Sequence, residues 1–125
     1  MAKIIYSKNA PEPIGPYSQA VLAGGMLYCS GAVPLDPVSG DIVGDAIEEQ
    51  TEQVMKNISA VLAAAGADFT AVVKATCFLK SMDDFAAFNG IYAKYFTGKP
   101  ARSCVEVSRL PKDVLVEVEV IAVVG

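Results

Sequence analysis

A stretch near the end of the chain combines strand-like alternation with charged side chains. It runs from Pro100 to Glu119 and reads P-A-R-S-C-V-E-V-S-R-L-P-K-D-V-L-V-E-V-E. Because successive side chains of a β-strand point to opposite faces, the pattern places Arg102, Cys104 and Glu106 on one face. Charged groups at core-like positions cost free energy unless they are paired or bound to a ligand. A site that holds an anion next to a carboxylate would explain the arrangement.

Three glutamates are candidates for acid–base work in such a site. In the second alternating run, the residues that share a face are Leu115, Glu117, Glu119 and Ile121. Since the chain has no histidine, a carboxylate is one of the groups left to hold or deprotonate a water. In the alternative interpretation, both glutamates of this run face solvent on an edge strand and the intervening valines are buried. The pattern does not rank Glu117, Glu119 and Glu106.

Arg102 and Cys104 suggest different chemistry. A guanidinium group is the preferred fork for a carboxylate or phosphate, and one charge-assisted hydrogen bond contributes about 1.5–3 kcal/mol. Arg102 follows Pro100 and Ala101, where the preceding loop can form a cleft, although a surface ion pair is the more common role of an arginine. Cys104 could be a nucleophile, but no partner base is evident, and a small buried hydrophobic residue is the favoured interpretation.

Four further residues could line a pocket. Tyr17 follows the Gly-Pro pair of the loop I-G-P-Y-S, and its ring and hydroxyl could form a pocket wall. Ser30 and Gly31 end a predicted strand with a hydroxyl and an exposed amide, which could contact a carboxylate or an oxyanion. Asn89 interrupts an aromatic stripe, where a buried amide would be hydrogen-bonded. The alternatives are a packed turn for Tyr17, an ordinary strand end for Ser30 and a structural tie for Asn89.

Length and composition indicate one domain with more apolar surface than a small monomer needs. The chain has 125 residues, 53% of them hydrophobic, and a mean hydropathy of +0.40. This length fits a single domain, residues 1–125, with a core that needs no disulfide or metal. No apolar run reaches the roughly 18–20 residues that span a bilayer. The surplus apolar surface therefore predicts a subunit interface of a homo-oligomer.

Charge and cysteine content narrow the classes of partner and cofactor. The net charge of −4 and the pI near 4.7 argue against nucleic-acid binding, which depends on a basic surface. Three cysteines without a C-x-x-C pair, and no histidine, indicate neither a metal site nor a disulfide framework. The lack of histidine also excludes Ser-His-Asp and Cys-His catalysis. The N-terminal residues do not resemble a signal peptide, so we expect a cytoplasmic protein without metal or organic cofactor.

The hydrophobic pattern predicts the element order β-β-β-α-β-α-β-β. Gly24 and Gly25 mark a hairpin turn between the second and third strands. The predicted strands are 4–6, 17–22, 26–30, 72–79, 101–107 and 114–123, and the helices lie at 45–66 and 81–98. This order favours an α+β fold with a mixed sheet, both helices on one face, and a second apolar face that needs a partner.

Both predicted helices carry a buried stripe and a capping signal. Asp45, with Glu48 three residues later, resembles a capping box, and Ser81 is the predicted cap of the second helix. The buried stripe of the first helix consists of Ile47, Thr51, Val54, Ile58, Val61 and Ala65. The stripe of the second helix is aromatic and consists of Phe85, Phe88, Tyr92, Tyr95 and Phe96.

Four blocks of the sequence resemble the RidA/YjgF family of enamine/imine deaminases. They are the stretch 100–119, I-G-P-Y-S-Q at 14–19, C-S-G at 29–31, and D-F-A at 84–86 together with Asn89. The resemblance covers essentially the whole chain, and the C-terminal block is specific. It implies a chorismate-mutase-like fold, in which two helices pack on a six-stranded sheet. It also implies a homotrimer with a site at each subunit interface.

The resemblance further implies an activity and roles for named residues. The expected reaction is hydrolysis of 2-iminobutanoate and 2-iminopropanoate, which form from 2-aminocrotonate and 2-aminoacrylate, to 2-keto acids and ammonia. Arg102 matches the family arginine that pairs with the substrate carboxylate, and Glu117 matches the glutamate that positions the attacking water. The other matching pocket residues are Tyr17, Ser30, Gly31, Asn89 and Cys104, the last through its backbone more than its thiol.

This reaction needs few catalytic groups. An imine protonated on nitrogen is already a strong electrophile, so an oriented carboxylate, a placed water and a proton sink suffice. The chain departs from many relatives in one place, because only the residues 97–99 separate Phe96 from Pro100. This short connection adjoins Arg102, and the sequence leaves open how it changes the breadth of the pocket and the preferred imine.

Three other functions are compatible with the same residues. The first is a non-catalytic module, chaperone-like or binding small carboxylates, although the presence of both Arg102 and Glu117 favours catalysis. The second is a translation-inhibiting endoribonuclease, against which the acidic charge and the lack of histidine count. The third is a biosynthetic role in purine or isoleucine metabolism, which clearing of imines could produce indirectly.

Overall fold

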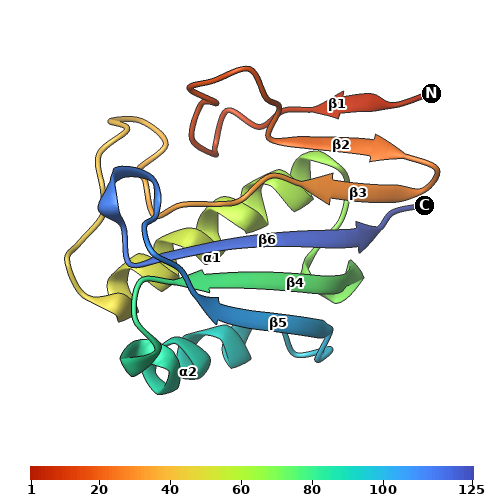
Figure 1. The fold of residues 1–125 in the computed structure, drawn as a ribbon. Helices are drawn as coiled ribbons and strands as arrows, with labels where there is room; N and C mark the ends of the chain where they lie inside the picture. Colours follow the sequence, from red (N-terminus) through yellow and green to blue (C-terminus); the bar gives the residue numbers. More distant parts are fainter.

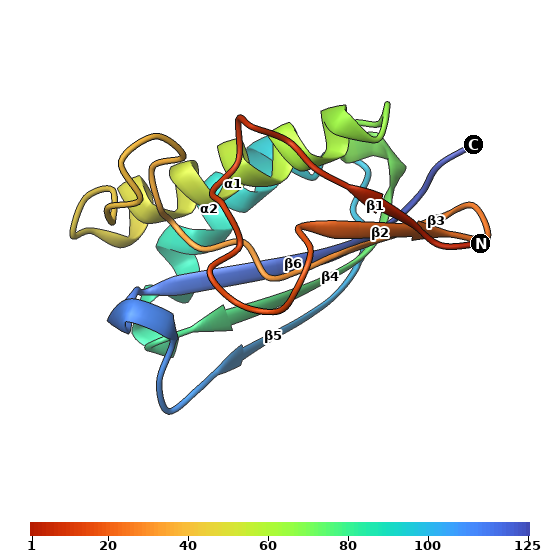
Figure 2. The ribbon, with the colours of Figure 1, turned by 90° about the horizontal axis from the view of Figure 1, so that it is seen from above.

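The structure, a computed structural model that describes all of residues 1–125, contains one six-stranded sheet and two α-helices (Figure 1). The strands are β1 (Lys3–Ile5), β2 (Ala20–Ala23), β3 (Met26–Cys29), β4 (Val72–Leu79), β5 (Ala101–Glu106) and β6 (Val116–Val123), and the helices are α1 (Ile47–Ala64) and α2 (Phe85–Tyr95). Their order across the sheet is β1-β2-β3-β6-β4-β5, and only β4 and β5 pair in parallel. Both helices cover the same face (Figure 2), so the predicted α+β fold is confirmed.

The connections follow from local sequence. Gly24 and Gly25 join β2 to β3 with φ angles of 58° and 76°, and two successive positive φ angles are what a tight hairpin turn requires. The predicted hairpin is therefore confirmed. The parallel pair β4 and β5 needs a crossover connection, and α2 supplies it.

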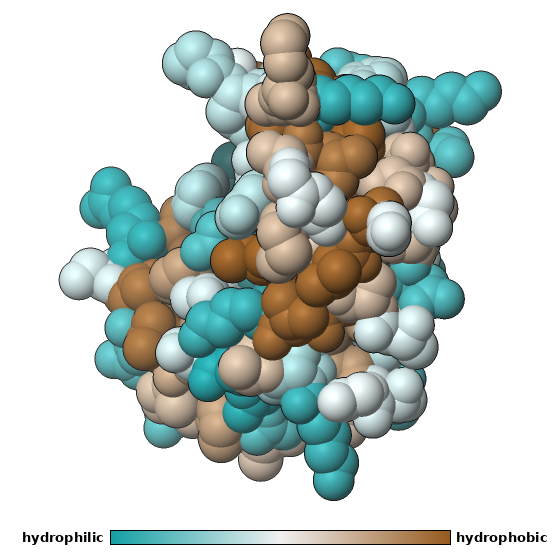
Figure 3. Space-filling model, turned by 90° about the vertical axis from the view of Figure 1, so that its right-hand side faces the viewer, coloured by the Kyte–Doolittle hydropathy of each residue, from teal (hydrophilic) through white to brown (hydrophobic).

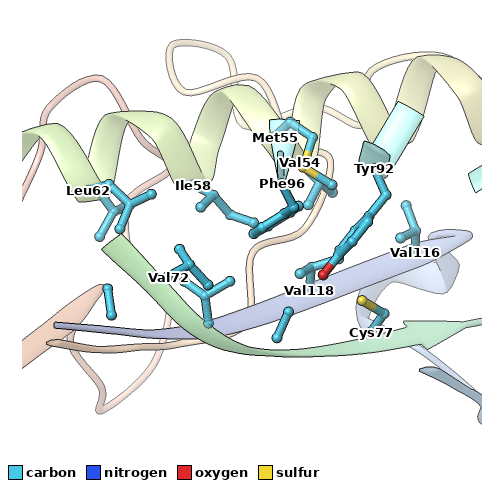
Figure 4. Close-up of a cluster of buried hydrophobic side chains, with 14 of the residues drawn as sticks. Val54, Met55, Ile58, Leu62, Val72, Cys77, Tyr92, Phe96, Val116 and Val118 are labelled. Carbon is cyan, nitrogen blue, oxygen red and sulfur yellow. The ribbon is translucent and has the colours of Figure 1, made fainter. Parts of the chain in front are cut away.

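The core lies between the helices and one face of the sheet. Alternate residues of β6, namely Val116, Val118 and Val120, are at most 1% exposed and point to the helices. Figure 4 shows side chains from α1, such as Val54 and Ile58, pointing toward the sheet. Burial of one such side chain contributes about 1.5–3 kcal/mol. The predicted stripe of α1 is confirmed for Ile47, Thr51, Val54, Ile58 and Val61, which are all buried. Its last member, Ala65, follows the helix and is only partly buried.

The predicted helix caps are wrong. The N-cap of α1 is Ala46, which makes no side-chain cap bond, so Asp45 lies one residue too early. The start of α1 is instead fixed by Gln50, which donates to the Gly44 carbonyl at 3.1 Å and accepts from the Leu115 amide at 2.8 Å. The hydrogen bond from the segment before β6 to the Gln50 side chain takes the place of a capping box.

Ser81 caps a different element from the one predicted. Its hydroxyl accepts from the Asp83 amide and caps the single 3-10 turn Met82–Asp84. Helix α2 begins only at Phe85, after that turn, and its N-cap, Asp84, makes no side-chain bond.

Two strands begin later than predicted because turns occupy the residues before them. The amide of Tyr17 donates to the Gly15 carbonyl at 2.8 Å, so the chain turns there and β2 begins at Ala20. Before β6, the 3-10 turn Pro111–Asp113 contains two residues with left-handed φ angles, and the strand begins at Val116.

The sheet face opposite the helices carries apolar side chains without cover. Ile4, Tyr28 and Val105 alternate with residues that face the helices, and they are 68%, 48% and 43% exposed. Hydrophobic residues also gather on the end of the molecule that holds both termini (Figure 3). Neither helix has the length and apolar sequence needed to cross a membrane.

Candidate functional site

The predicted site residues fall into two groups within one chain. Tyr17, Ser30, Gly31 and Glu117 line a single cavity of about 520 Å³. Arg102, Asn89 and Cys104 are absent from that cavity and lie around helix α2 and strand β5. We describe the two groups as the glutamate half-site and the arginine half-site.

Loops at one end of β3 and β6 build the glutamate half-site. The strand-like bridge between Ala32 and Val118 lays the segment after β3 along β6, with hydrogen bonds of 2.8 and 3.1 Å. The same cavity receives side chains from the loop before β2, from α1 and from the turn before β6. Its further polar lining residues are Glu12, Gln19, Asn57, Lys112 and Glu119.

Glu117 packs directly against Gly31. A Cβ atom added to Gly31 would lie 2.7 Å from Cδ of Glu117 and closer still to its Oε2. Real Cβ atoms do not make such contacts, so the carboxylate occupies space that only a glycine leaves free. The sequence predicted that Gly31 contacts a ligand through its amide, whereas the structure gives this residue a steric role.

The environment of Glu117 favours its protonated form. Burial raises the pKa of this carboxyl, and the charge of the neighbouring Glu119 raises it further. A carboxylate whose pKa moves toward neutrality is a better general base at physiological pH. The residues near it include no group of three or more carboxylates and cysteines that could hold a metal ion.

Geometry separates the three glutamates that the pattern left unranked. Glu117 and Glu119 line the cavity, whereas Glu106 accepts a hydrogen bond from the Met82 amide at 2.9 Å. Glu106 therefore stabilises the turn before α2. Its position on the same face as Arg102 and Cys104 agrees with the predicted alternation.

Gln19, for which the sequence pattern predicts no role, holds the loop that carries Tyr17. The Gln19 side chain is 8% exposed and contacts four backbone atoms of residues 7–11, at 2.7 to 3.4 Å. The hydroxyl of Ser30 donates to the Ser18 carbonyl at 2.6 Å, so it can only accept a hydrogen bond from a ligand. The only signal in the sequence was a polar residue at an inward position just before β2.

The arginine half-site presents a cation without an acidic partner. Nη1 of Arg102 donates to Oδ1 of Asn89 at 2.6 Å, and the one salt bridge of the protein joins Lys80 and Asp113. The common surface ion pair of an arginine is therefore absent. Its remaining guanidinium donors have no hydrogen-bond partner in the chain and are free to take a carboxylate.

Cys104 has the character of a thiol, not a thiolate. It is half-buried, and burial raises its pKa. It lies in register with Cys77 on the neighbouring strand β4, and burial raises the pKa of Cys77 to about 12. Both observations favour the interpretation of Cys104 as a packing residue.

The two half-sites lie on opposite faces of the sheet. Arg102 pairs with Ala75 on β4 and points to α2, where it meets Asn89. Glu117 pairs with Phe78 on β4 and alternates with the buried valines of β6, so it points away from the helices. One chain therefore does not bring Arg102 and Glu117 together.

Comparisons with known proteins place the chain in a family. The family model described as Endoribonuclease L-PSP matches residues 7–124. A RutC family protein of Pyrococcus horikoshii is 55% identical over 123 residues, which are 98% of both proteins. The crystal structure of YyfA, a Rid family protein of Yersinia pestis, matches with a TM-score of 0.96 and 52% identity over 99% of this chain and 100% of that one.

A third comparison comes with a ligand. The crystal structure of Escherichia coli TdcF with bound serine matches with a TM-score of 0.93 and 40% identity, over 98% of this chain and 99% of that one. The relatives cover this chain almost from end to end, in sequence and in fold. The protein is thus a member of the RidA/YjgF family.

Proposed function

We propose that this protein is a 2-imino acid deaminase that converts 2-iminobutanoate and 2-iminopropanoate to 2-keto acids and ammonia. The observation that carries the proposal is Arg102, a partly buried guanidinium that has free donors and no acidic partner. Such a group fits the carboxylate of a small acid. Glu117, with its raised pKa, fits the role of the base.

The reaction needs one water and a shuttled proton. The enamines 2-aminocrotonate and 2-aminoacrylate gain a proton on carbon and become imines that are protonated on nitrogen. The Arg102 guanidinium binds the substrate carboxylate, and Glu117 accepts a proton from the water that attacks the imine carbon. The resulting carbinolamine has one new C–O bond. Return of the proton to nitrogen lets the C–N bond break and releases ammonia. The carbinolamine hydroxyl gives its proton to the ionised Glu117 as the C=O bond forms, which leaves the keto acid.

We also propose that the complete site forms between neighbouring subunits of a homotrimer. Arg102 and Glu117 lie on opposite faces of one sheet, so two chains are needed to bring them to one substrate. The uncovered apolar sheet face offers surface for such an assembly. TdcF, a relative whose crystal structure contains serine, is a precedent for an amino acid ligand in this family.

The three free cysteines support a reducing compartment, and we propose a cytoplasmic enzyme. We do not propose RNA cleavage, although the matching family model has the description of an endoribonuclease. RNA is a polyanion, and electrostatic repulsion would oppose its binding. The protein has a net charge of −4, and its cavity is lined by Glu12, Glu117 and Glu119.

A coupled assay tests the proposal. A threonine or serine dehydratase generates the enamine, and the release of keto acid is followed with and without this protein. We expect acceleration by the wild type, and a loss of at least about 100-fold in Arg102→Ala, because a charge-assisted fork is removed. Arg102→Lys should recover little of it, since an ammonium group lacks the fork.

The matched control is Arg109→Ala, which removes the only other arginine of the chain from an exposed position. It should retain the wild-type rate. A folded wild type that binds 2-oxobutanoate but does not accelerate keto acid release would contradict the deaminase and leave a carboxylate-binding module.

A further inference from the structure

We propose that Tyr92 is the positioning residue that fixes the orientation of the Arg102 guanidinium and thereby sets the affinity of the site for the substrate carboxylate. The inference rests on the proposed function for its meaning in catalysis. Its structural basis is independent of that function: Cζ of Arg102 lies 4.7 Å from the centroid of the Tyr92 ring, over its face.

Three residues of α2 hold the guanidinium from different directions. Phe85, Asn89 and Tyr92 are four and three residues apart, so they share one face of the helix. Asn89 binds an edge of the guanidinium through Nη1, while the rings of Tyr92 and Phe85 lie 4.7 and 5.5 Å from Cζ. An edge contact combined with a face contact fixes the plane of the group.

The ring of Tyr92 is itself held firmly. Tyr92 is 8% exposed, stacks on Phe96 at 4.2 Å with an interplanar angle of 20°, and contacts Phe88 at 5.6 Å. Figure 4 shows it reaching from α2 toward the sheet, with its hydroxyl near Cys77. Arg102 is only partly buried, so the packed ring of Tyr92 gives its side chain a rigid support.

The ring, and not the hydroxyl, carries this role. The Tyr92 hydroxyl is buried and has no hydrogen-bond partner. Burial also raises its pKa to about 12, so the phenol is neutral at physiological pH and forms no ion pair with Arg102. A phenylalanine at this position therefore keeps everything that the guanidinium uses, whereas a leucine removes it.

The first test compares Tyr92→Leu with Tyr92→Phe. We expect Tyr92→Leu to weaken binding of 2-oxobutanoate, measured by calorimetry, by about tenfold, the size expected for loss of a partly desolvated cation–π contact. The KM for the imine should rise by the same factor while kcat changes less than about twofold, because uniform binding is lost. Tyr92→Phe should match the wild type in all three values.

Phe69→Leu is the matched control. It makes the same aromatic-to-leucine change in the same cluster, where Phe69 contacts Tyr95 and Phe96 but has no contact with the guanidinium. It should lower thermal stability and leave 2-oxobutanoate affinity unchanged. An equal loss of affinity in Phe69→Leu and Tyr92→Leu would overturn the proposal, because the effect would then be general loosening of the core.

A second measurement works on the wild type and does not depend on the folding of a leucine variant. The chain has only two arginines, Arg102 and Arg109, so its NMR spectrum contains two Nε–Hε signals. Hε of Arg102, identified by its loss in Arg102→Lys, should be shifted upfield by the ring current and should keep that shift in Tyr92→Phe. A signal of Arg102 that coincides with that of exposed Arg109 would overturn the proposal.

Failure of the inference and failure of the proposed function have different signatures. Normal turnover in the wild type and unchanged affinity in Tyr92→Leu would contradict the role of Tyr92 alone. A wild type without turnover, in which 2-oxobutanoate binding still depends on Tyr92, would contradict the deaminase and support the role of Tyr92 in holding Arg102.

Discussion

Arg102 and Glu117 lie on opposite faces of one sheet, and strand β4 separates their strands. Any reaction that uses both residues on one substrate therefore draws them from two chains. The proposed reaction therefore requires the protein to assemble into an oligomer.

Subunit mixing tests this relationship. Arg102→Ala and Glu117→Gln should each be inactive alone. After exchange of subunits in an equal mixture, about a quarter of the sites in a cyclic oligomer would combine an intact arginine with an intact glutamate from the neighbour. The mixture should therefore recover about a quarter of the wild-type rate. If native mass spectrometry shows mixed oligomers and no activity returns, both residues act within one chain or not together.

The contact between Gly31 and Glu117 leads to a second prediction. Gly31→Ala should displace the Glu117 carboxylate and reduce kcat more than KM, with little change in the free energy of unfolding, because the displaced atoms are the far end of a flexible side chain. The control is Gly90→Ala in helix α2, where an added Cβ meets nothing within 4 Å. Alanine there should stabilise the helix by about 0.5–1 kcal/mol and leave turnover unchanged. Wild-type turnover in Gly31→Ala, as expected for Gly90→Ala, would contradict the steric role of Gly31.

The raised pKa of Glu117 predicts the acid limb of the pH profile. Glu117 acts as a base only when ionised, so activity should fall as the pH drops through its raised pKa. Because the charge of Glu119 contributes to the raised pKa, Glu119→Gln should move this limb to lower pH. The check is kcat/KM as a function of pH, with a saturating amount of dehydratase at every pH. An acid limb that moves to higher pH in Glu119→Gln would show that another group is the base.

The same pKa shift also makes the stability of the fold depend on pH. The dependence runs in the opposite direction from the one that a salt-bridged carboxylate produces. Burial favours the protonated form of Glu117 in the folded state, so the unfolded chain releases its proton first as the pH rises. Its contribution to stability is thus complete below the ordinary glutamate pKa and is lost as the pH rises through the folded value. Glu117→Gln should therefore be more stable than the wild type at neutral pH, and this difference should disappear in acid.

Cys104→Ser should keep substantial activity. Burial raises the pKa of the thiol, which is the opposite of what an activated nucleophile needs. The imine assay checks this, with circular dichroism as the control for folding. Complete loss of turnover in a folded variant would assign the sulfur a chemical role.

Alternation along a strand could be predicted from the sequence, but the face to which each alternating set points could not. The pattern correctly put Arg102 with Cys104, and Glu117 with Glu119. Whether a set faces the helices depends on the pairing of β5 and β6 with β4, which is a long-range property. For the same reason the sequence did not show that the two half-sites lie apart.

Local competition between turns and regular structure explains the errors at element ends. The fragment around Tyr17 has strand-like residues, yet the Gly-Pro turn before it delays β2 to Ala20. Asp45 is a good helix cap in isolation, but Gln50 fixes the start of α1 through contacts with the nearby Gly44 carbonyl and the distant Leu115 amide. Contacts between segments far apart in sequence outweighed local preference in the second case.

Gln19 fixes the course of the loop before β2 through main-chain atoms alone, those of Ser7, Ala10 and Pro11. None of these contacts depends on which side chains the loop carries. Mutations in the loop can therefore exchange groups that line the cavity, such as Glu12, without changing the path of the backbone. The exposed lining positions Glu12 and Ile14 are therefore suitable places to randomise in a directed-evolution library for new substrates, with Gln19 and the buried Ala10 held constant.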